Sequence, residues 1–176
     1  SCYTKTVLLF ETIKGILIES GGDKMAERSK MNEIINRYAD MVYRIALNNV
    51  KTRHDADDVF QEVFLRCVKF QRKNGDFQSE DHLKAWLIRV TVNCCKKFWS
   101  SGWKRHVVFG EEPSEPFLLP EENGIHEALT ALPPKYRNVL HLFYFEDMAV
   151  KEIACVLRQK EPTVRMQLTR GRTMLR

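Results

Sequence analysis

The chain has 176 residues, of which 44% are hydrophobic and 29% are charged, and this balance is typical of a folded globular protein. Lys and Arg number 28 against 23 Asp and Glu, so the formal net charge of +5 favours a polyanionic partner. No apolar run approaches the ~20 residues that span a bilayer, and we expect no membrane insertion. The five cysteines include no CxxC pair, which indicates a reducing, cytoplasmic compartment and neither a disulfide framework nor a zinc knuckle.

The charge falls into blocks that predict how the chain is divided. Residues 84–105 contain six basic and no acidic residues, whereas residues 106–134 contain six acidic residues and no Lys or Arg. Residues 150–176 carry a net charge of +5 by themselves. Such blocks indicate two cationic surfaces on either side of an acidic connector. The predicted division is an N-terminal extension outside the fold at residues 1–30, a first domain at 31–105, an acidic, flexible linker at 106–123 and a second domain at 124–176.

Apolar residues at spacings of three and four predict three helices in the first domain. The first helix has a stripe that starts at Ile34 and ends at Asn49. Asp55 is the expected N-cap of the second helix, and a loop is expected at residues 71–78. Ser79 is expected to cap a third helix, which Gly102 should end. The predicted stripes are Ile34, Tyr38, Val42, Ile45 and Asn49; Ala56, Val59, Phe60, Val63, Phe64, Cys67 and Val68; and Leu83, Trp86, Leu87, Val90, Cys94 and Phe98.

The second domain is also predicted to be helical throughout. The expected helices are at roughly 125–131, 134–146, 149–157 and 161–175, and the short β-branched runs elsewhere are too isolated to form a sheet. The predicted fold class is therefore all-α, with two small helical domains.

The last 27 residues have the pattern of a helix-turn-helix. A short helix with one apolar face is followed by a three-residue turn at 158–160, and Glu161 and Pro162 then suit the start of a second helix. Gly171 inside that helix predicts a close approach of two helices, because Gly costs about 1 kcal/mol there against Ala. Val164, Leu168, Gly171 and Leu175 are predicted to face inward, and Pro162, Arg165, Met166, Thr169, Arg170, Arg172 and Thr173 to face outward.

Arginine and threonine on the outer face of the second helix suit base recognition in the major groove of DNA. Arg can bind guanine with two hydrogen bonds, and Thr and Met can contact the thymine methyl group. The alternative is a solvated basic helix without a DNA partner.

The third helix combines basic residues with tryptophans, a composition that can hold unpaired bases by stacking. Trp86 belongs to the apolar stripe and is equally well explained as a core residue. Trp99 and Trp103 are the better candidates for exposed stacking, although aromatic residues that contact only protein are as common. Composition alone leaves single-strand binding open.

The second helix carries acidic and amide side chains on the face opposite its apolar stripe. Such a face either lies in solvent or docks a basic partner helix, and the spacing does not separate these interpretations. The residues of this face are Asp57, Asp58, Gln61 and Glu62.

Two blocks of the chain resemble the extracytoplasmic-function sigma factors of the sigma-70 family. Residues 43–47, 55–66 and 83–93 resemble region two of these factors, and residues 128–140, 153–154 and 163–172 resemble region four. The motifs include Asp55-Ala-Asp-Asp-Val-Phe-Gln-Glu and Ala128-Leu-Thr-Ala-Leu-Pro-Pro. Together the two regions cover roughly residues 32–105 and 125–176.

The resemblance implies a bacterial initiation factor that binds core RNA polymerase and brings it to promoter DNA. The acidic face of the second helix would dock on the polymerase, and an inhibitory anti-sigma factor is a further expected partner. The positions implied for polymerase binding are Asp57, Asp58, Gln61 and Glu62; for the melted downstream element, Lys73, Asn74, Trp86, Arg89, Asn93 and Lys97; and for the upstream duplex element, Thr163, Arg165, Met166, Thr169, Arg170 and Arg172.

The chain departs from the family pattern at the helix-turn-helix. The turn usually carries glycine where Arg158 stands, which predicts a strained or differently built backbone at this position. A basic residue is common where Gln167 stands, so the upstream sequence preference is expected to differ.

Two other classes of function were weighed. A helix-turn-helix regulator acting without the polymerase explains residues 125–176 but gives the second and third helices no role. An enzyme would need a nucleophile or metal site, and neither the vicinal Cys94 and Cys95 nor the five histidines have the required spacing. We therefore expect no catalytic residue, no metal and no cofactor.

Overall fold

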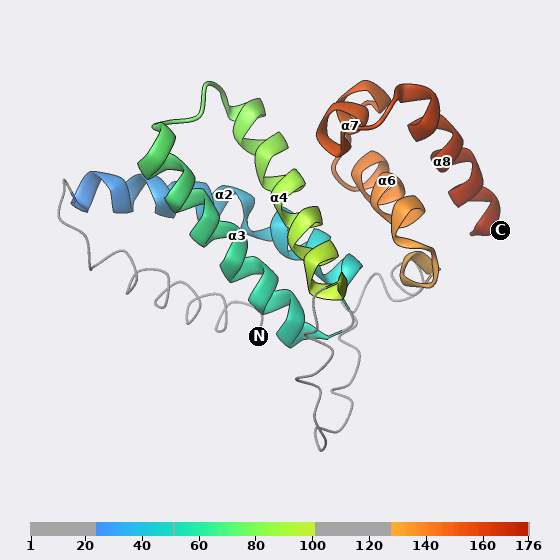
Figure 1. The fold of residues 1–176 in the computed structure, drawn as a ribbon, viewed down its shortest axis with the longest axis horizontal. Helices are drawn as coiled ribbons and strands as arrows, with labels where there is room; N and C mark the ends of the chain where they lie inside the picture. The colour runs from blue at the N-terminus through green and yellow to red at the C-terminus, as the bar shows by residue number, and fades with distance from the viewer. Residues whose placement is uncertain (1–23, 51, 101–127, 176) are drawn as a thin grey trace, which may run out of the picture.

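The computed structural model describes residues 24–50, 52–100 and 128–175, and all regular elements in these ranges are helices (Figure 1). The predicted all-α fold class is confirmed. The predicted linker at 106–123 and the end of the third helix at Gly102 lie outside the described residues. The helices are α2 (Lys24–Asn49), α3 (Arg53–Asn74), α4 (Glu80–Ser100), α6 (Pro134–Tyr144), α7 (Val150–Leu157) and α8 (Glu161–Met174), and residues 128–131 are also helical.

The first bundle consists of α2, α3 and α4, each of which packs against the other two. The apolar stripes predicted for α2 and α3 are buried, and Val42, Phe64 and Leu87 are completely inaccessible at the centre of the bundle. The stripe predicted for α4 is only partly right: Leu83, Leu87 and Cys94 are buried, but Trp86 and Val90 are half-buried, and the side chain of Phe98 lies outside the described residues. The buried face of α4 also includes Ile88, Thr91, Val92 and Cys95.

The helix ends of the first bundle differ from the prediction in two places. Asp55 is not the N-cap of α3: Thr52 has extended backbone angles, and its hydroxyl accepts a hydrogen bond from the Asp55 N–H. The predicted loop at 71–78 is shorter, because α3 continues to Asn74 and Gly75, with φ of 76°, donates its N–H to the Gln71 carbonyl. Ser79 does cap α4, as predicted, by accepting from the His82 N–H.

Helix α2 begins at Lys24, inside the segment that was predicted to be an extension outside the fold. Met31 is buried in the core of the bundle, and Lys30 forms an ion pair with Asp76 at the far end of α3. The start of the first domain predicted at residue 31 therefore falls within a continuous helix. The physical reason is that a stretch of mostly polar residues can extend an amphipathic helix by several turns without an apolar signal of its own.

The second bundle consists of α6, α7 and α8. The turn at 158–160 joins α7 to α8, and Pro162 lies in the first turn of α8. Gly171 is buried where α8 crosses α6, and a Cβ atom there would lie 2.8 Å from Leu140 Cδ1. The predicted close approach of two helices is therefore confirmed.

One side chain of α8 was assigned to the wrong face. Leu175 was predicted to face inward, but it is 41% exposed. It follows Met174, the last residue of α8, and its backbone N–H bonds to the Gly171 carbonyl at the end of the helix. The helical period overestimates burial here, because the bundle offers no packing partner beyond the last turn.

The two bundles are in contact with each other. Helix α2 packs against α6, and α4 packs against α7. In Figure 1 the second bundle lies beside α4, at the opposite end of the molecule from the start of α2. Among the described helices, none has both the length and the apolar character that crossing a bilayer requires.

Candidate nucleic-acid interface

The outer face of α8 carries a group of exposed side chains suited to contact DNA. Arg165, Met166, Thr169 and Arg170 are all exposed, as predicted. Glu161 holds the Arg165 guanidinium at 3.2 Å, and the Thr169 hydroxyl donates to the Arg165 carbonyl at 3.1 Å. These bonds lie along the helix surface, so the guanidinium and the hydroxyl remain accessible to a ligand in front of the helix.

Arg170 of this group and the neighbouring Arg172 both lie beside side chains of α6. The Arg170 guanidinium lies beside the Tyr136 hydroxyl and lowers the pKa of that tyrosine. Arg172 lies over the rings of Phe143 and Tyr144, with its guanidinium carbon 5.5 Å from each ring centre. Arg172 is exposed, and its predicted contact with the upstream element stays a prediction.

Two other positions of α8, Thr163 and Gln167, are less exposed than the outer face. Thr163 is only half-buried, near the start of the helix. Gln167 is buried in the bundle, so the residue that departs from the family pattern does not belong to the outer face. The different upstream sequence preference expected from Gln167 stays a prediction, and any effect of this residue on it would act through the packing of α8.

The backbone of the turn explains how α8 is held against α7. Arg158 has φ of 54° and ψ of 49°, which is the left-handed conformation, and its N–H caps α7 by donating to the carbonyls of Ala154 and Cys155. The departure from glycine noted in the sequence therefore falls on a position where glycine would be unstrained. The prediction of a strained backbone at Arg158 is confirmed.

Helix α4 brings four of the predicted single-strand contacts onto one face. Trp86, Arg89, Asn93 and Lys97 follow one another at spacings of three and four, so they form a row along the helix. Asn93 and Lys97 are exposed, whereas Arg89 is half-buried and its guanidinium is engaged by α7. The structure brings these residues together but does not leave them all equally accessible.

An aromatic cluster lies where α3 ends and α4 begins. Phe70 stacks on Phe77 with ring centres 4.8 Å apart, and Trp86 contacts both rings at 5.2 and 5.4 Å. His82 meets the edge of Phe77. Trp86 is therefore half-buried in a packed cluster, and its ring supports the loop at 75–79. Sequence reasoning missed Phe70 and Phe77, for which the only local signal is an aromatic residue before the polar loop and one within it.

The other two predicted single-strand contacts, Lys73 and Asn74, are exposed at the end of α3. The Asn74 amide donates to the Phe70 carbonyl at 3.1 Å, which helps to close the helix. Both residues directly precede the loop at 75–79. Trp86 belongs both to the aromatic cluster and to the row on α4.

The predicted polymerase-binding face of α3 is formed by four half-buried side chains, Asp57, Asp58, Gln61 and Glu62. Tyr43 donates its hydroxyl proton to Asp57 at 2.9 Å, and Arg66 donates to Glu62 at 2.6 Å. Burial raises the pKa of Asp58, and His54 partly opposes this shift. Since spacings of one and four residues place the four side chains on one side of the helix, they present a joined acidic and amide surface.

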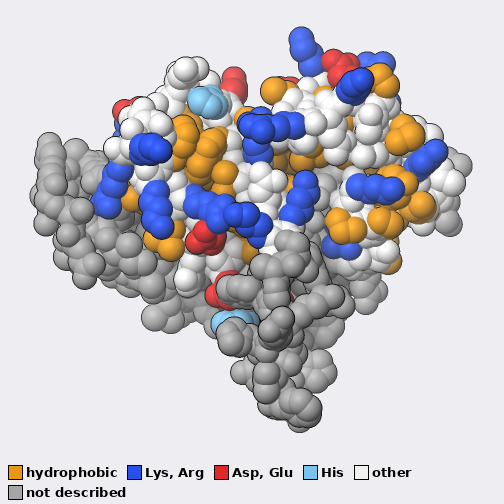
Figure 2. Space-filling view, viewed as in Figure 1, with side chains coloured by type: hydrophobic (Ala, Val, Ile, Leu, Met, Phe, Trp, Pro, Cys, Tyr) orange, Lys and Arg blue, Asp and Glu red, His pale blue; other side chains and the backbone are white. Residues whose placement is uncertain are grey.

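Figure 2 shows that Lys and Arg side chains outnumber carboxylates on the face that α3, α4 and the second bundle share in this view. Hydrophobic side chains are interspersed among them, and such a surface can combine phosphate binding with contacts to bases. Among the described residues, His, Cys, Asp and Glu form no group of three that could hold a metal ion.

Two family models match the chain, and they match it in the two bundles. The model of sigma-70 region 2 matches residues 34–105, and the model of sigma-70 region 4 matches residues 122–175. The chain belongs to the sigma-70 family. Residues 34–105 are therefore region two and residues 122–175 are region four. The resemblance stated from the sequence motifs is confirmed.

Curated relatives place the chain among the extracytoplasmic-function members of the family. It is 28% identical over 174 residues to the extracytoplasmic-function sigma factor SigE of Mycolicibacterium smegmatis, covering 91% of this chain and 65% of that protein. It is 26% identical over 172 residues to SigW of Bacillus subtilis, covering 87% of this chain and 90% of that protein. The sigma-70 family consists of initiation factors, which bind core RNA polymerase and direct it to promoters, and this is the function of the chain.

Solved structures share the fold. The sigma factor RpoE of Bartonella quintana, in complex with the anti-sigma factor NepR, has a TM-score of 0.62 at 19% identity, covering 83% of this chain and 94% of that chain. CnrH, in complex with the cytosolic domain of CnrY, also has a TM-score of 0.62, at 18% identity, covering 96% and 92%.

Proposed function

We propose that the two bundles divide promoter recognition between them. Region four reads the upstream element as duplex through α8, and region two holds the melted downstream element along α4 and the loop at 75–79. The observation that carries this proposal is the exposed group of Arg165, Met166, Thr169 and Arg170 on the second helix of a helix-turn-helix.

The chemistry of α8 suits direct readout of base pairs. A helix of its diameter fits the major groove, where Arg165 can donate two hydrogen bonds to guanine. Met166 is an exposed apolar side chain, 41% accessible, that can meet a thymine methyl group, and Thr169 adds a hydroxyl one turn after Arg165. Glu161 orients the Arg165 side chain before DNA binds, which lowers the conformational entropy lost on binding.

The chemistry of α4 suits a single strand. The Asn93 amide has donors and an acceptor that match the edge of an unpaired base, and Lys97 adds positive charge one turn further on. Lys73 and Asn74 approach the same surface from the end of α3. We assign Trp86 a supporting role, because its ring packs against the stacked pair of Phe70 and Phe77 at the loop.

We propose that the acidic face of α3 docks on core RNA polymerase. Its carboxylates are half-buried and held by Tyr43 and Arg66, so the face is ordered before it meets a partner. An ordered, negatively charged surface favours a basic partner. Because it lies on α3, it can bind the polymerase while α4 contacts DNA.

We further propose that the protein acts in the cytoplasm and has an anti-sigma partner. The protein is expected in the cytoplasm because the RNA polymerase that it binds acts there. The anti-sigma partner is supported by the solved relative of the same fold that is bound to the anti-sigma factor NepR.

Transcription with core polymerase tests the assignment of α8. Run-off transcription across a genomic library, with and without the protein, identifies its promoters. The double variant Arg165→Ala/Arg170→Ala should then lose about 1–3 kcal/mol of promoter binding for each true base contact. Lys151→Ala is the matched control, since it removes an exposed positive charge from α7.

Two outcomes would contradict the proposal. Unchanged footprints over the upstream element in the double variant would remove α8 as the reading helix. Binding of the protein to duplex operators without any effect of core polymerase would favour a regulator that acts alone, for which neither the family matches nor the relatives give support.

A further inference from the structure

The loop at 75–79, which joins α3 to α4 at the top of Figure 1, has little backbone structure of its own. Its backbone hydrogen bonds lie at its two ends, where Gly75 donates to the Gln71 carbonyl and the Leu83 N–H donates to the Ser79 carbonyl. Within the ranges that the structure describes, no backbone hydrogen bond joins its three middle residues to another part of the chain. Side chains therefore set the position of the loop.

On the side of α3 and α4, the loop is held by the ring of Phe77. This ring stacks on Phe70 with centres 4.8 Å apart and contacts Trp86 at 5.4 Å. One anchored ring fixes one point of a loop, so the orientation of the loop depends on contacts at its ends.

Helix α2 contacts the loop near its first end. Lys30 forms an ion pair with Asp76, the second residue of the loop, and both side chains are more than half exposed. An exposed ion pair adds little to the stability of a fold. Its effect here is local, because it ties a segment with few other contacts to a long helix.

Helix α2 also contacts the position directly after the loop. Glu80 is the first residue of α4, and its Oε1 accepts from the Arg37 guanidinium at 2.6 Å and from the Tyr38 hydroxyl at 3.1 Å. The hydrogen bond from Arg37, with that from Tyr38, lowers the pKa of the Glu80 carboxyl. Because Tyr38 is buried in the core of the first bundle, this contact ties the end of the loop to a fixed point.

A cleft of about 310 Å³ lies between α2 and the loop. Its border includes Lys30, Asp76, Phe77 and Glu80. Since packed side chains do not fill this space, the loop has room to shift towards α2. The two polar contacts, rather than dense packing, keep the loop at its distance from the helix.

From these contacts we infer that α2 positions the loop at 75–79 for the melted strand, through the Lys30–Asp76 ion pair and the bonds from Arg37 and Tyr38 to Glu80. We call these the α2–loop contacts. The inference rests on the proposed function, in which the loop and α4 hold the melted downstream element. A loop that is already held in place loses less conformational entropy when the strand binds. The residues of the α2–loop contacts are therefore positioning residues, which act through the loop.

The positioning role predicts effects that charge alone does not. Removing Asp76 and Glu80 makes the protein more positive, and by charge alone this change would tighten DNA binding. Removing Lys30 and Arg37 makes the protein less positive, and by charge alone this change would weaken it. If the α2–loop contacts position the loop, both changes weaken the binding of the melted strand, because both break the same contacts.

The test uses the full chain together with core polymerase. Its variants are Asp76→Ala/Glu80→Ala on the side of the loop, Lys30→Ala/Arg37→Ala on α2, and the quadruple variant that combines them. A further variant, Lys30→Arg/Arg37→Lys, keeps both positive charges and should restore binding. Thermal unfolding followed by circular dichroism checks that each variant is folded.

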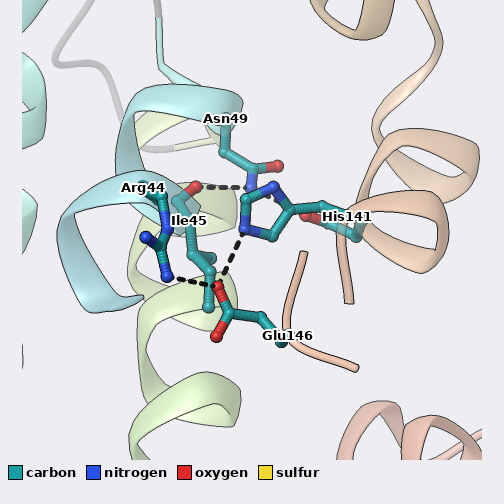
Figure 3. A network of polar contacts seen from close by, with 6 residues as sticks. Arg44, Ile45, Asn49, His141 and Glu146 are labelled. Carbon is teal, nitrogen blue, oxygen red and sulfur yellow. Dashed lines mark hydrogen bonds and ion pairs between the residues drawn. The ribbon is translucent and has the colours of Figure 1, made fainter. Parts of the chain in front are cut away.

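The matched control for the carboxylates is Asp40→Ala/Asp81→Ala. These two exposed residues lie on α2 and in the first turn of α4, so the control removes the same charge from the same helices and the same end of α4. Arg44, the next arginine along α2, is unsuitable as a control for Arg37, because its guanidinium lies 3.3 Å from Glu146 of the second bundle (Figure 3).

Titration with a promoter fragment whose downstream element is already melted gives the apparent affinity of the complex with polymerase. We expect each double alanine variant on the α2–loop contacts to bind about three- to tenfold more weakly, since the loop must then be ordered during binding. The quadruple variant should lose no more than either double variant, because residues that act through shared contacts are not additive. The control should bind at least as tightly as the wild type.

Base preference gives a measurement that a merely structural role would not change. Each base of the melted element is changed in turn. At one or two positions the change should cost the double variants less than it costs the wild type, because a displaced loop discriminates less. Base changes in the upstream duplex element should cost all proteins equally, and co-purification with core polymerase should be unchanged.

The outcomes separate the positioning role from the function on which it rests. If the wild type binds the melted element but the double variants bind equally well, the positioning role is refuted and the proposed function stands. It is also refuted if only one double variant binds more weakly, or if the two losses multiply in the quadruple variant, since either result indicates direct contacts with DNA. If the wild type with polymerase does not bind the melted element, the proposed function fails and the positioning role fails with it.

Discussion

The turn between α7 and α8 offers a direct test of the backbone argument. Arg158 has φ of 54° and ψ of 49°, a left-handed conformation that costs an L-residue about 1–2 kcal/mol and costs glycine almost nothing. Replacing Arg158 by Gly removes this strain and so stabilises the folded state. The greater freedom of glycine in the unfolded chain opposes this gain by about 0.4–1 kcal/mol. The net gain in the free energy of unfolding should be about 0.5–1 kcal/mol.

The gain is best measured against Arg158→Ala rather than the wild type. Both variants lose the arginine charge near the end of α7, so their difference isolates the backbone. Urea and thermal unfolding of the full chain, followed by circular dichroism at the helical band, should place Arg158→Gly above Arg158→Ala by about 1–4 °C in Tm.

A second position serves as an internal control. Asp147 also has a positive φ, of 52°, but aspartate tolerates the left-handed region better than arginine does. Asp147→Gly should therefore gain less over Asp147→Ala than Arg158→Gly gains over Arg158→Ala. Equal stability of the Gly and Ala variants at residue 158 would refute the claim that this backbone is strained.

Three further predictions concern the binding surfaces and the cysteines. Charge reversal by Asp58→Lys/Glu62→Lys should weaken co-purification with core polymerase, because it inverts the charge of the docking face of α3. Asn93→Ala should slow promoter opening, as followed by permanganate reactivity of unpaired thymines, because it removes the exposed amide of α4. Iodoacetamide at pH 8 should label the exposed Cys155 of the native protein long before Cys67, since burial raises the pKa of the Cys67 thiol to about 12.

Each of these predictions has its own control. Reversal of Glu33 and Asp40, two exposed carboxylates on α2, should leave co-purification unchanged, and an equal loss would mean that only net charge matters. Asn36→Ala should open promoters normally, and normal opening by Asn93→Ala would remove that residue from the site. Rapid labelling of Cys67 in the folded chain, seen by peptide mass mapping, would contradict its burial.

Local chemistry was enough to predict most of the helical framework. The buried stripes of α2 and α3, the Ser79 cap and the turn at 158–160 follow from spacing and residue type within a few positions of the chain. Gly171 could be interpreted in the same way, because its cost inside a helix points to a close neighbour. The family resemblance was likewise carried by short motifs that lie on single helices.

The exact first and last residues of the helices were harder to predict from the sequence, because neighbouring residues can each act as the cap. Thr52 and Asp55 are both good capping residues, and only the backbone conformation decides that the Thr52 hydroxyl accepts the first bond of α3. The extension of α3 to Asn74 depends on Gly75, whose left-handed N–H reaches back to Gln71. Propensity alone does not rank such alternatives.

The sequence by itself determined most of the helices and which faces of α3 and α8 carry polar groups, because these properties repeat with the local helical period. Only the tertiary structure decided which groups meet. Asn49 and Asn138 are 89 residues apart in the chain, and Arg89 caps a helix that begins 61 residues later, at Val150. No local signal marks such pairs, because each side chain can bond to water or to its own helix and meets its distant partner only where the two bundles pack together.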